Sequence, residues 1–471
     1  MKTTYVFFAA VLFLSIGYSF IGTNGAYGVE PGTFKWSFLL STALNLGSVA
    51  VDDDGTIYVG TRNGRLYALN PDGSEKWSYD TGDEFVNVPA IGNDGTVYLC
   101  TRYFHDLYAF NPDGSVRWTF AAMPGPSGAP AIAKDGRIFV GAGSSLYAFT
   151  PDGEVVLDFP TGGMVKDPVI DINGNIYFIS FPVMPEEATL FAVNTFGWYL
   201  WSYKFPVNFA GSLAIGNGGR IYVSMDKLYA FWPNGDLSWT FPTDNNSYHP
   251  SAPSIGADGT IYVSGSGWFY AVNPDGTEKW HIVTARQEPP SALIGKDGTA
   301  YLTLTMNALF AMNPVEPYMR WYFGTDAQIY SSPALSDDGT LYMVDEFRVI
   351  ALYTDSYGPA NSSWPMYRAN NKRTARIDKY WFAINNIRRL LRRVKADNLK
   401  NGIKRSLVAK LDSSVDSLLM EKVTPAVNKL NAFANEVEAL AGKKISMEEA
   451  EYLAVNAREI ADSLRSFMTH Y

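Results

Sequence analysis

Short apolar strands alternate with polar turns along most of this chain. Between Trp36 and Trp364 one unit recurs eight times: a two-residue polar turn, an apolar strand such as IYVG, a second strand such as LYALN, a tight turn and a tryptophan. A period of about forty residues is typical of repeat architectures. The pattern therefore predicts a chain built from eight similar β-units.

The first marker of each unit is a two-residue turn before the apolar strand. The eight turns are Asp54-Gly55, Asp94-Gly95, Asp135-Gly136, Asn173-Gly174, Gly218-Gly219, Asp258-Gly259, Asp297-Gly298 and Asp338-Gly339. Such pairs tolerate the positive φ angles of type I′ hairpins. In one copy the segments SAPSIG, TIYVS, FYAVN and EKWHIV read as four successive strands. Four antiparallel strands in about forty residues predict a propeller blade.

The second marker is a fixed spacing from an alanine, across the tight turn, to a tryptophan. A tryptophan at a constant position in each blade is predicted to pack between neighbouring blades, where its burial contributes on the order of a few kcal/mol. Trp198 and Trp268 fall outside this pattern and are the alternative candidates for a ligand platform. The structural tryptophans are Trp36, Trp77, Trp118, Trp201, Trp239, Trp280 and Trp321.

Eight markers predict an eight-bladed β-propeller with four-stranded antiparallel blades over residues 34–357. A blade cannot bury both faces of its sheet alone, so the blades must stack and the ring must close. The strand at 34–38 has an outer-strand sequence but no blade before it. We therefore expect it to complete the eighth blade, which joins residues near 36 and 350.

The repeats resemble those of the pyrroloquinoline-quinone-type (PQQ-like) β-propeller family over roughly residues 34–368. In its tryptophan-docking motif a glycine precedes the tryptophan by four positions, as in Gly73 and Trp77 or Gly276 and Trp280. The turn here is one residue shorter than in the quinoprotein enzymes and closer to that of the non-enzymatic members. The resemblance implies a propeller and leaves activity open.

Candidate catalytic and cofactor groups are sparse. The alcohol-oxidising members of that family hold the quinone under a ring of two adjacent cysteines and coordinate calcium, whereas this chain has the single Cys100 and no haem-attachment motif. Its four histidines show no metal-ligand spacing, and no nucleophile elbow is present. We therefore predict no catalytic residue, no metal and no cofactor. A quinone-dependent dehydrogenase with calcium, or a carbohydrate-active enzyme, is the alternative.

Propellers usually bind ligands at the mouths of the central channel, where loops from all blades converge. Arg62 and Arg102 both follow an inner strand of their blades, so they are predicted to project from one rim. The alternative interpretation of each candidate is that it is an ordinary loop residue exposed to solvent. The other polar or aromatic candidates in the connections between blades are Asp83, Glu84, Tyr248, His249, Arg286, Glu288, Gln328 and Tyr330.

The first 28 residues read as a secretory signal: Lys2, an apolar run from Tyr5 to Ile21, and small residues ending at Gly28. An uncleaved anchor is the alternative, and no lipobox cysteine follows the run. An exported protein located in the periplasm, on the cell surface or outside the cell is expected. With one cysteine it forms no intramolecular disulfide.

After the propeller the composition changes. Residues 358–376 are turn-rich and are predicted as a linker, whose Trp364-Pro-Met-Tyr-Arg segment resembles a signature that flanks PQQ-like repeats. From 377 to 471 the apolar spacing is helical and predicts a small all-α bundle. The bundle resembles the FIMAH domain, chiefly at Lys410-Leu411 and in the GKKI segment that starts at Gly442. That module implies surface location and interaction, with no reaction.

Charge separates the two parts. Residues 1–371 hold 19 Lys and Arg against 35 Asp and Glu, whereas residues 372–471 hold 19 against 12, so the ring is acidic and the tail basic. One predicted helix face carries Arg388, Arg389, Arg392 and Arg393. This face could contact an anionic membrane surface, a cell-wall polymer or the propeller, or it could simply be solvated.

These features together predict a non-enzymatic binding scaffold of the cell envelope. Its propeller-mouth loops would recognise a protein or a glycan, and its basic tail would supply attachment or a second contact. Nucleic acid is not expected as a partner of an exported protein. After signal cleavage no transmembrane segment is expected.

Overall fold

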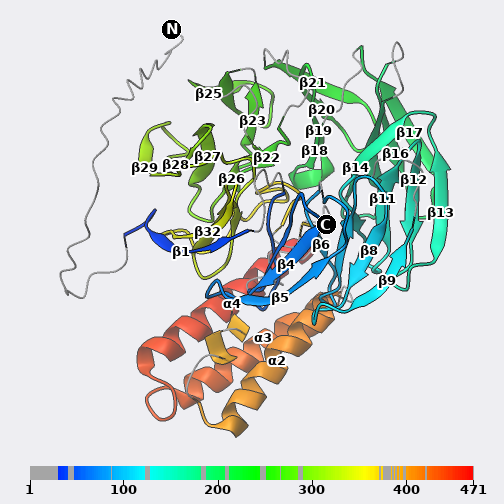
Figure 1. The fold of residues 1–471 in the computed structure, drawn as a ribbon. Helices are drawn as coiled ribbons and strands as arrows, with labels where there is room; N and C mark the ends of the chain where they lie inside the picture. Colours follow the sequence, from blue (N-terminus) through cyan, green and yellow to red (C-terminus); the bar gives the residue numbers. More distant parts are fainter. Residues whose placement is uncertain are drawn as a thin grey trace. The chain divides into compact units, whose positions relative to one another are not determined.

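The computed structural model divides the chain into two compact units, Met1–Ile377 and Asp378–Tyr471, which are described separately. The N-terminal unit consists of eight four-stranded antiparallel sheets arranged as a ring (Figure 1). The structure describes residues 30–40, 47–85, 87–121, 128–181, 187–206, 212–243, 251–265, 267–284, 290–370, 373–374, 383, 387, 390–391, 393–395, 399–419 and 422–469.

The first four blades each take four consecutive strands. Their strands are β2 (Ala50–Val51), β3 (Ile57–Gly60), β4 (Arg65–Leu69) and β5 (Glu75–Asp80) in blade 1; β6 (Ala90–Ile91), β7 (Val97–Cys100), β8 (Leu107–Phe110) and β9 (Val116–Phe120) in blade 2; β10 (Ala131–Ile132), β11 (Ile138–Ala142), β12 (Ser145–Phe149) and β13 (Val155–Pro160) in blade 3; and β14 (Met164–Ile170), β15 (Ile176–Phe181), β16 (Thr189–Val193) and β17 (Tyr199–Lys204) in blade 4.

Blades 5 to 7 repeat the same order, and blade 8 takes three strands from the end of the ring and one from its start. Their strands are β18 (Ser212–Ile215), β19 (Ile221–Ser224), β20 (Lys227–Phe231) and β21 (Leu237–Pro242) in blade 5; β22 (Ser254–Ile255), β23 (Ile261–Gly265), β24 (Trp268–Val272) and β25 (Glu278–Val283) in blade 6; β26 (Leu293–Ile294), β27 (Ala300–Thr305), β28 (Ala308–Met312) and β29 (Met319–Gly324) in blade 7; and β30 (Ala334–Leu335), β31 (Thr340–Val344), β32 (Arg348–Tyr353) and β1 (Phe34–Leu39) in blade 8.

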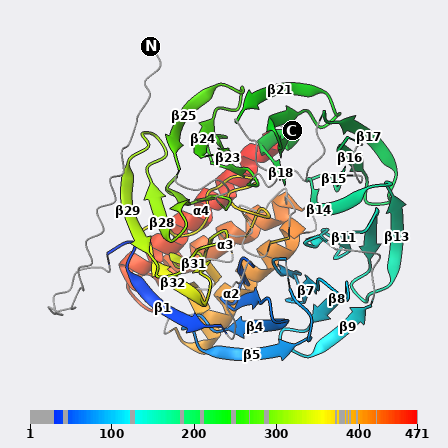
Figure 2. The same cartoon turned by 45° about the horizontal axis from the view of Figure 1, so that its top comes forward.

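The ring closes through β1, which pairs antiparallel with β32. Trp36 lies opposite Ala351 and Phe38 lies opposite Val349. Figure 2 shows β1 on the circumference, in series with the outer strands of the other blades. The prediction of eight four-stranded blades, with an N-terminal strand completing the last one, is confirmed.

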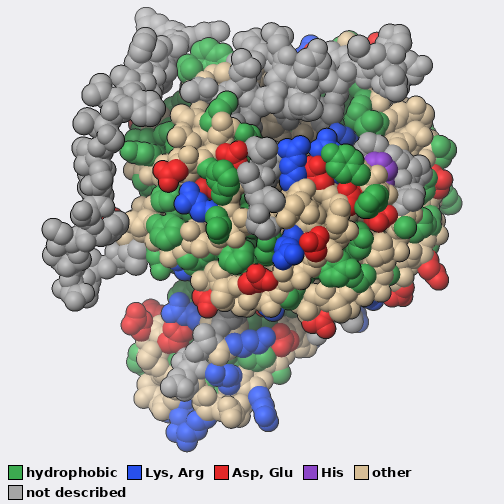
Figure 3. Space-filling model, viewed as in Figure 1, with side chains coloured by type: hydrophobic (Ala, Val, Ile, Leu, Met, Phe, Trp, Pro, Cys, Tyr) green, Lys and Arg blue, Asp and Glu red, His purple; other side chains and the backbone are tan. Residues whose placement is uncertain are grey.

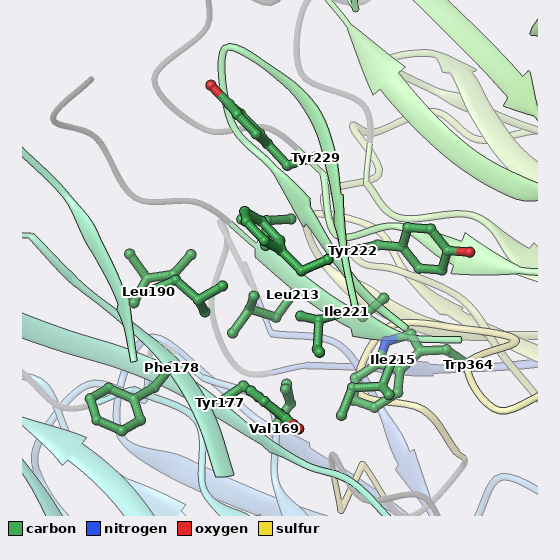
Figure 4. Close-up of a cluster of buried hydrophobic side chains, with 14 of the residues drawn as sticks. Val169, Tyr177, Phe178, Leu190, Leu213, Ile215, Ile221, Tyr222, Tyr229 and Trp364 are labelled. Carbon is green, nitrogen blue, oxygen red and sulfur yellow. The ribbon is translucent and has the colours of Figure 1, made fainter. Parts of the chain in front are cut away.

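The core lies between the blades, because each sheet is covered on both faces by its neighbours. The second strand of blade 1, Ile57–Gly60, is therefore buried along its whole length. Figure 4 shows how Phe178 and Leu190 from blade 4 and Ile221 and Tyr222 from blade 5 belong to one apolar cluster. A near-continuous apolar strand, rather than an alternating one, follows from this double coverage.

Six of the repeat tryptophans bind the blade that follows their own. Their indole N–H groups donate to the carbonyl of the proline in the following blade's tight turn, at 2.8–3.1 Å in the pairs Trp36–Pro71, Trp77–Pro112, Trp118–Pro151, Trp201–Pro233, Trp239–Pro274 and Trp280–Pro314. The turn glycine lies against the ring: Gly73 has a φ of 89°, and a Cβ there would come within 2.6 Å of Trp36. Glycine is thus required by both conformation and contact.

Residues 358–370 and 373–374, which we call the channel segment, lie against the inner strands of the ring. Each inner strand pairs with only one neighbour in its blade, so its other edge faces the axis. The channel segment uses these edges: Ile255 N–H donates to Trp364 O at 2.7 Å, and Ile294 N–H donates to Pro365 O at 2.8 Å. The segment that the sequence predicts as a linker therefore also packs inside the propeller.

Two arginines of the channel segment are buried. Arg368 donates to Pro168 O in blade 4 and to Ala129 O before blade 3, at 3.2 and 3.0 Å. Arg373 is fully buried, and its loss of hydration lowers its pKa to about 9, so it stays protonated at neutral pH. Backbone carbonyls, which are good acceptors for a guanidinium, compensate for the lost water.

The C-terminal unit is a region of four helices. Helical residues between Ala383 and Lys395 precede α2 (Asn401–Leu419), α3 (Val423–Leu440) and α4 (Met447–Thr469). Their apolar faces form one core. Ser446 caps α4, because its hydroxyl accepts the N–H of Glu449 at 3.1 Å. Within the described part of the chain, no helix is both long and apolar enough to cross a membrane.

Candidate binding site on the propeller rim

The alternating strand directions sort the loops onto two faces of the ring. The loop between the second and third strands of a blade and the connection to the next blade emerge on one face, which we call the connection face. The other two turns of each blade emerge on the opposite face, the turn face. Arg62 follows β3, Arg102 follows β7 and Glu84 lies between β5 and β6, so all three lie on the connection face.

Glu84 joins the two arginines. Its Oε1 lies 2.8 Å from Nε of Arg62, and Nη1 of Arg102 lies 3.1 and 3.2 Å from its two carboxylate oxygens. The Glu84 side chain is only 7% exposed, whereas both arginines are about two-fifths exposed. Arg62 and Arg102 thus lie on one rim, and a buried carboxylate positions them.

Asp83 positions the loop that carries Arg102. Its carboxylate accepts the backbone N–H of Tyr103 at 3.0 Å and that of Phe104 at 2.7 Å. With their backbone fixed in this way, the Tyr103 and Phe104 side chains are 64% and 61% exposed. The guanidinium of Arg102 also lies 5.4 Å from the centre of the Tyr103 ring. The buried carboxylates of Asp83 and Glu84 thus fix the positions of the exposed side chains above them.

We call Arg62, Asp83, Glu84, Arg102, Tyr103 and Phe104 the rim cluster. It combines two exposed guanidinium groups with two exposed aromatic rings. Arginine, tyrosine and phenylalanine are enriched in protein interfaces, and guanidinium groups bind carboxylates in a bidentate manner. In the view of Figure 3, basic, acidic and hydrophobic side chains are interspersed over the propeller.

Gln328 and Tyr330 also lie on the connection face, between β29 and β30. The Tyr330 hydroxyl donates to Oε1 of Gln328. Ile329, between them, forms a β-bridge with Asp345, as Phe85 does with Thr101 in the connection that carries Glu84. The two connections thus share one backbone arrangement, and Gln328 takes the place of Glu84.

Several predicted residues lie outside the described residues. They are Tyr248, His249, Arg286 and Glu288 in the propeller and Arg388, Arg389 and Arg392 in the tail. Arg393 is described, and it binds Glu449 through two hydrogen bonds of 2.7 and 2.5 Å that raise its pKa. Of the alternative ligand tryptophans, Trp198 is exposed, and Trp268 packs edge-on against His281 with 5.0 Å between ring centres.

The sequence interpretation missed Tyr103 and Phe104. A signal was available: two adjacent aromatic residues occupy a loop where blade 1 has Asn63 and Gly64. Among the residues that the structure describes, no group of three or more His, Cys, Asp or Glu side chains is placed to hold a metal ion.

Part of the propeller sequence is similar to known proteins. Residues 25–169 match the sequence model of a family described as "Outer membrane protein assembly factor BamB". The repeats in this region are thus similar to PQQ-like repeats. A 69-residue stretch is 36% identical to "Uncharacterized protein YxaL" of Bacillus subtilis (strain 168) and covers 14% of this chain and 17% of YxaL. The chain thus matches only about a sixth of that relative's length.

Solved structures share the propeller fold at low sequence identity. BamB from Moraxella catarrhalis has a TM-score of 0.55 and 16% identity, over 68% of this chain and 99% of that one. The quinohemoprotein alcohol dehydrogenase ADHIIG from Pseudomonas putida HK5 has a TM-score of 0.58 and 13% identity, over 70% and 77%. At such identities the likeness shows the fold, which an assembly factor and an oxidoreductase both use.

Proposed function

We propose that this protein is an exported, non-enzymatic scaffold of the cell envelope that binds a protein partner through the rim cluster. The observation that carries the proposal is the buried Glu84 that holds Arg62 and Arg102 beside the exposed Tyr103 and Phe104. Fixed arginines beside exposed aromatic rings have the composition of interface hot spots. The match to a family described as an assembly factor supports a protein as the partner.

Export and attachment are parts of the same proposal. The apolar run from Tyr5 to Ile21 supports a secretory signal, although it lies outside the described residues. The net positive charge of residues 372–471 and their resemblance to the FIMAH domain support a role of the tail in attachment or in a second contact.

Replacing Tyr103 and Phe104 by serine tests the rim cluster. Both side chains are mostly exposed, so the Tyr103→Ser/Phe104→Ser variant should fold normally. We expect recovery of its principal protein partner, after chemical cross-linking in the native cell envelope and quantitative mass spectrometry of the tagged full-length chain, to fall at least about tenfold.

Tyr322→Ser is the matched control, because Tyr322 is similarly exposed but lies on the outer strand β29. It should leave partner recovery unchanged. Equal recovery from the rim variant and the wild type would contradict the proposal, and so would retention of a glycan with no cross-linked protein.

The absence of a redox cofactor is also proposed, and it has its own test. The full-length protein should be mixed with pyrroloquinoline quinone and calcium, separated from free quinone by gel filtration, and assayed for dye reduction with alcohols and sugars. We expect neither a bound chromophore nor dye reduction. A quinoprotein alcohol dehydrogenase serves as the positive control, and stoichiometric quinone on this chain would favour the enzyme alternative.

A further inference from the structure

A polar contact recurs between the outer strand and the first turn of most blades. A lysine or arginine one residue before the repeat tryptophan forms an ion pair with the aspartate of the hairpin turn. The pairs, with N–O distances of 2.7–3.5 Å, are Lys35–Asp338, Lys76–Asp54, Arg117–Asp94, Lys279–Asp258 and Arg320–Asp297. These side chains give the outer wall of those blades a charged surface.

Blades 3 and 4 break this pattern. The position of the basic residue is taken by Val156 in β13 and by Leu200 in β17. In the tight turn of blade 4, Phe196 and Trp198 stand where the first blade has Asp72 and Ser74. Charged and polar groups at four equivalent positions are thus replaced by apolar ones in two consecutive blades.

The replacements leave large apolar side chains in solvent. Phe196 and Trp198 are each 72% exposed, and Val155, Val156, Tyr199 and Leu200 are also exposed. We call these six residues the apolar wall. A contiguous exposed apolar patch on a soluble protein usually marks an interaction site. Blades 2 and 5 fold with polar residues at the positions of Phe196, Trp198 and Leu200, so the fold does not require apolar side chains at these positions.

The apolar wall continues across the junction between the two blades. A Cβ on Gly197 would come within 2.3 Å of Leu157, so the turn that carries Phe196 and Trp198 rests on the outer strand of blade 3. Leu157 occupies the position of the repeat tryptophan there. Figure 2 shows β13 and β17 in succession along the circumference. The residues of both strands can therefore meet one partner.

Two features favour a protein as the partner. The rings of Phe196 and Trp198 are inclined by 46°, so they do not form the flat platform on which a sugar ring would stack. Aliphatic side chains from β13 and β17 make up much of the rest of the apolar wall. The border beside β13 carries more acidic than basic groups: Asp152, Glu154 and Asp158 are exposed there. Arg117 pairs with Asp152 at 3.1 Å, and the Arg137 guanidinium lies 5.7 Å from the centre of the Phe196 ring. A complementary surface has an apolar centre and basic residues around it.

We propose that the apolar wall docks a folded protein whose apolar contact surface is bordered by lysine and arginine. The apolar wall includes the tight turn of blade 4, which lies on the turn face, whereas the rim cluster lies on the connection face. This second docking surface therefore goes beyond the function proposed for the rim cluster, and the two can be tested separately.

Photo-cross-linking tests the apolar wall. The photoreactive p-benzoylphenylalanine is placed at position 198 of the full-length chain, and at position 115 as the control, because Ser115 occupies the same turn position in blade 2. In the cells that produce the protein, we expect one discrete protein adduct from position 198 and none from position 115. Mass spectrometry identifies the adduct, whose cross-linked surface should be apolar with a basic border.

Binding of the identified and purified partner then gives the quantitative test. Phe196→Asp/Trp198→Ser restores the side chains of the blade 1 turn, where Ser74 donates to Asp72, so the variant should keep the wild-type melting temperature. We expect its Kd to rise at least about tenfold. Tyr103→Ser/Phe104→Ser should bind this partner like the wild type.

The apolar-wall proposal would be overturned by equal adducts from both positions, an adduct with a second copy of the chain, adducts with glycan or lipid only, or unchanged affinity of the Phe196→Asp/Trp198→Ser variant. Loss of binding by the Tyr103→Ser/Phe104→Ser variant alone would assign the partner to the rim cluster and would equally overturn this proposal.

Discussion

Replacing Trp280 by alanine is expected to lower the free energy of unfolding by about 3–5 kcal/mol. Trp280 is 7% exposed and packs against Tyr262 and Phe269, with ring centres 5.9 and 6.2 Å away. Its N–H donates to Pro314 O of the next blade at 3.0 Å. The substitution leaves a cavity between blades 6 and 7 and removes the donor to that carbonyl. Urea unfolding followed by circular dichroism measures the loss.

Two further variants separate the causes. Trp280→Phe keeps an aromatic ring and removes the donor, so it should cost less than Trp280→Ala, with about 1 kcal/mol from the hydrogen bond itself. Trp198→Ala removes the same side chain from an exposed position and should change stability by less than about 0.5 kcal/mol. Equal effects of Trp280→Ala and Trp198→Ala would show that the docking of Trp280 does not stabilise the ring.

The fold could be predicted from the sequence because its determinants are local and repeated. Each Asp-Gly or related pair fixes a hairpin, and most tight turns present a glycine to a tryptophan of the preceding blade. Even the closing strand was predictable, since a strand carrying Trp36 with no blade before it needs a partner. Ring closure joins distant parts of the chain. The single strand at the start of the ring has no blade of its own, and the eighth blade lacks an outer strand, so each identifies the other.

The rim cluster could be predicted only in part. Arg62 and Arg102 share a position in the repeat, so their common face followed from strand order. The role of Glu84 did not, because it depends on the path of a connection that no repeat specifies. Burial of that carboxylate is visible only when the neighbouring loops are in place.

The channel segment shows the limit of composition as a guide. Glycine, proline, serine and asparagine are frequent from Gly358 to Asn371, as expected for a surface connection. The inner strands of the ring, however, leave backbone groups unpaired toward the axis, and buried backbone groups require partners. A turn-rich segment can supply such partners at irregular spacing, which a regular strand could not do.

Replacing Arg373 by methionine is the second substitution for which a large loss is expected, about 3–5 kcal/mol. The Arg373 guanidinium donates to Val49 O before blade 1 and to Pro333 O before blade 8, both at 3.0 Å, and also to Tyr367 O. It therefore joins the first and last blades at the axis, whereas the pairing of β1 with β32 closes the ring at the circumference within blade 8. Methionine fills part of the space and leaves those carbonyls without this donor.

Arg65→Met is the matched control, because Arg65 is a partly exposed residue of blade 1 whose ion pair with Asp80 spans 3.3 Å. An exposed pair of this kind contributes at most about 1 kcal/mol. Urea unfolding of both full-length variants should therefore show a large loss for Arg373→Met and a small one for Arg65→Met. If the two losses were equal, the arginine at the axis would be dispensable for closure, and the pairing of β1 with β32 would suffice to hold the ring.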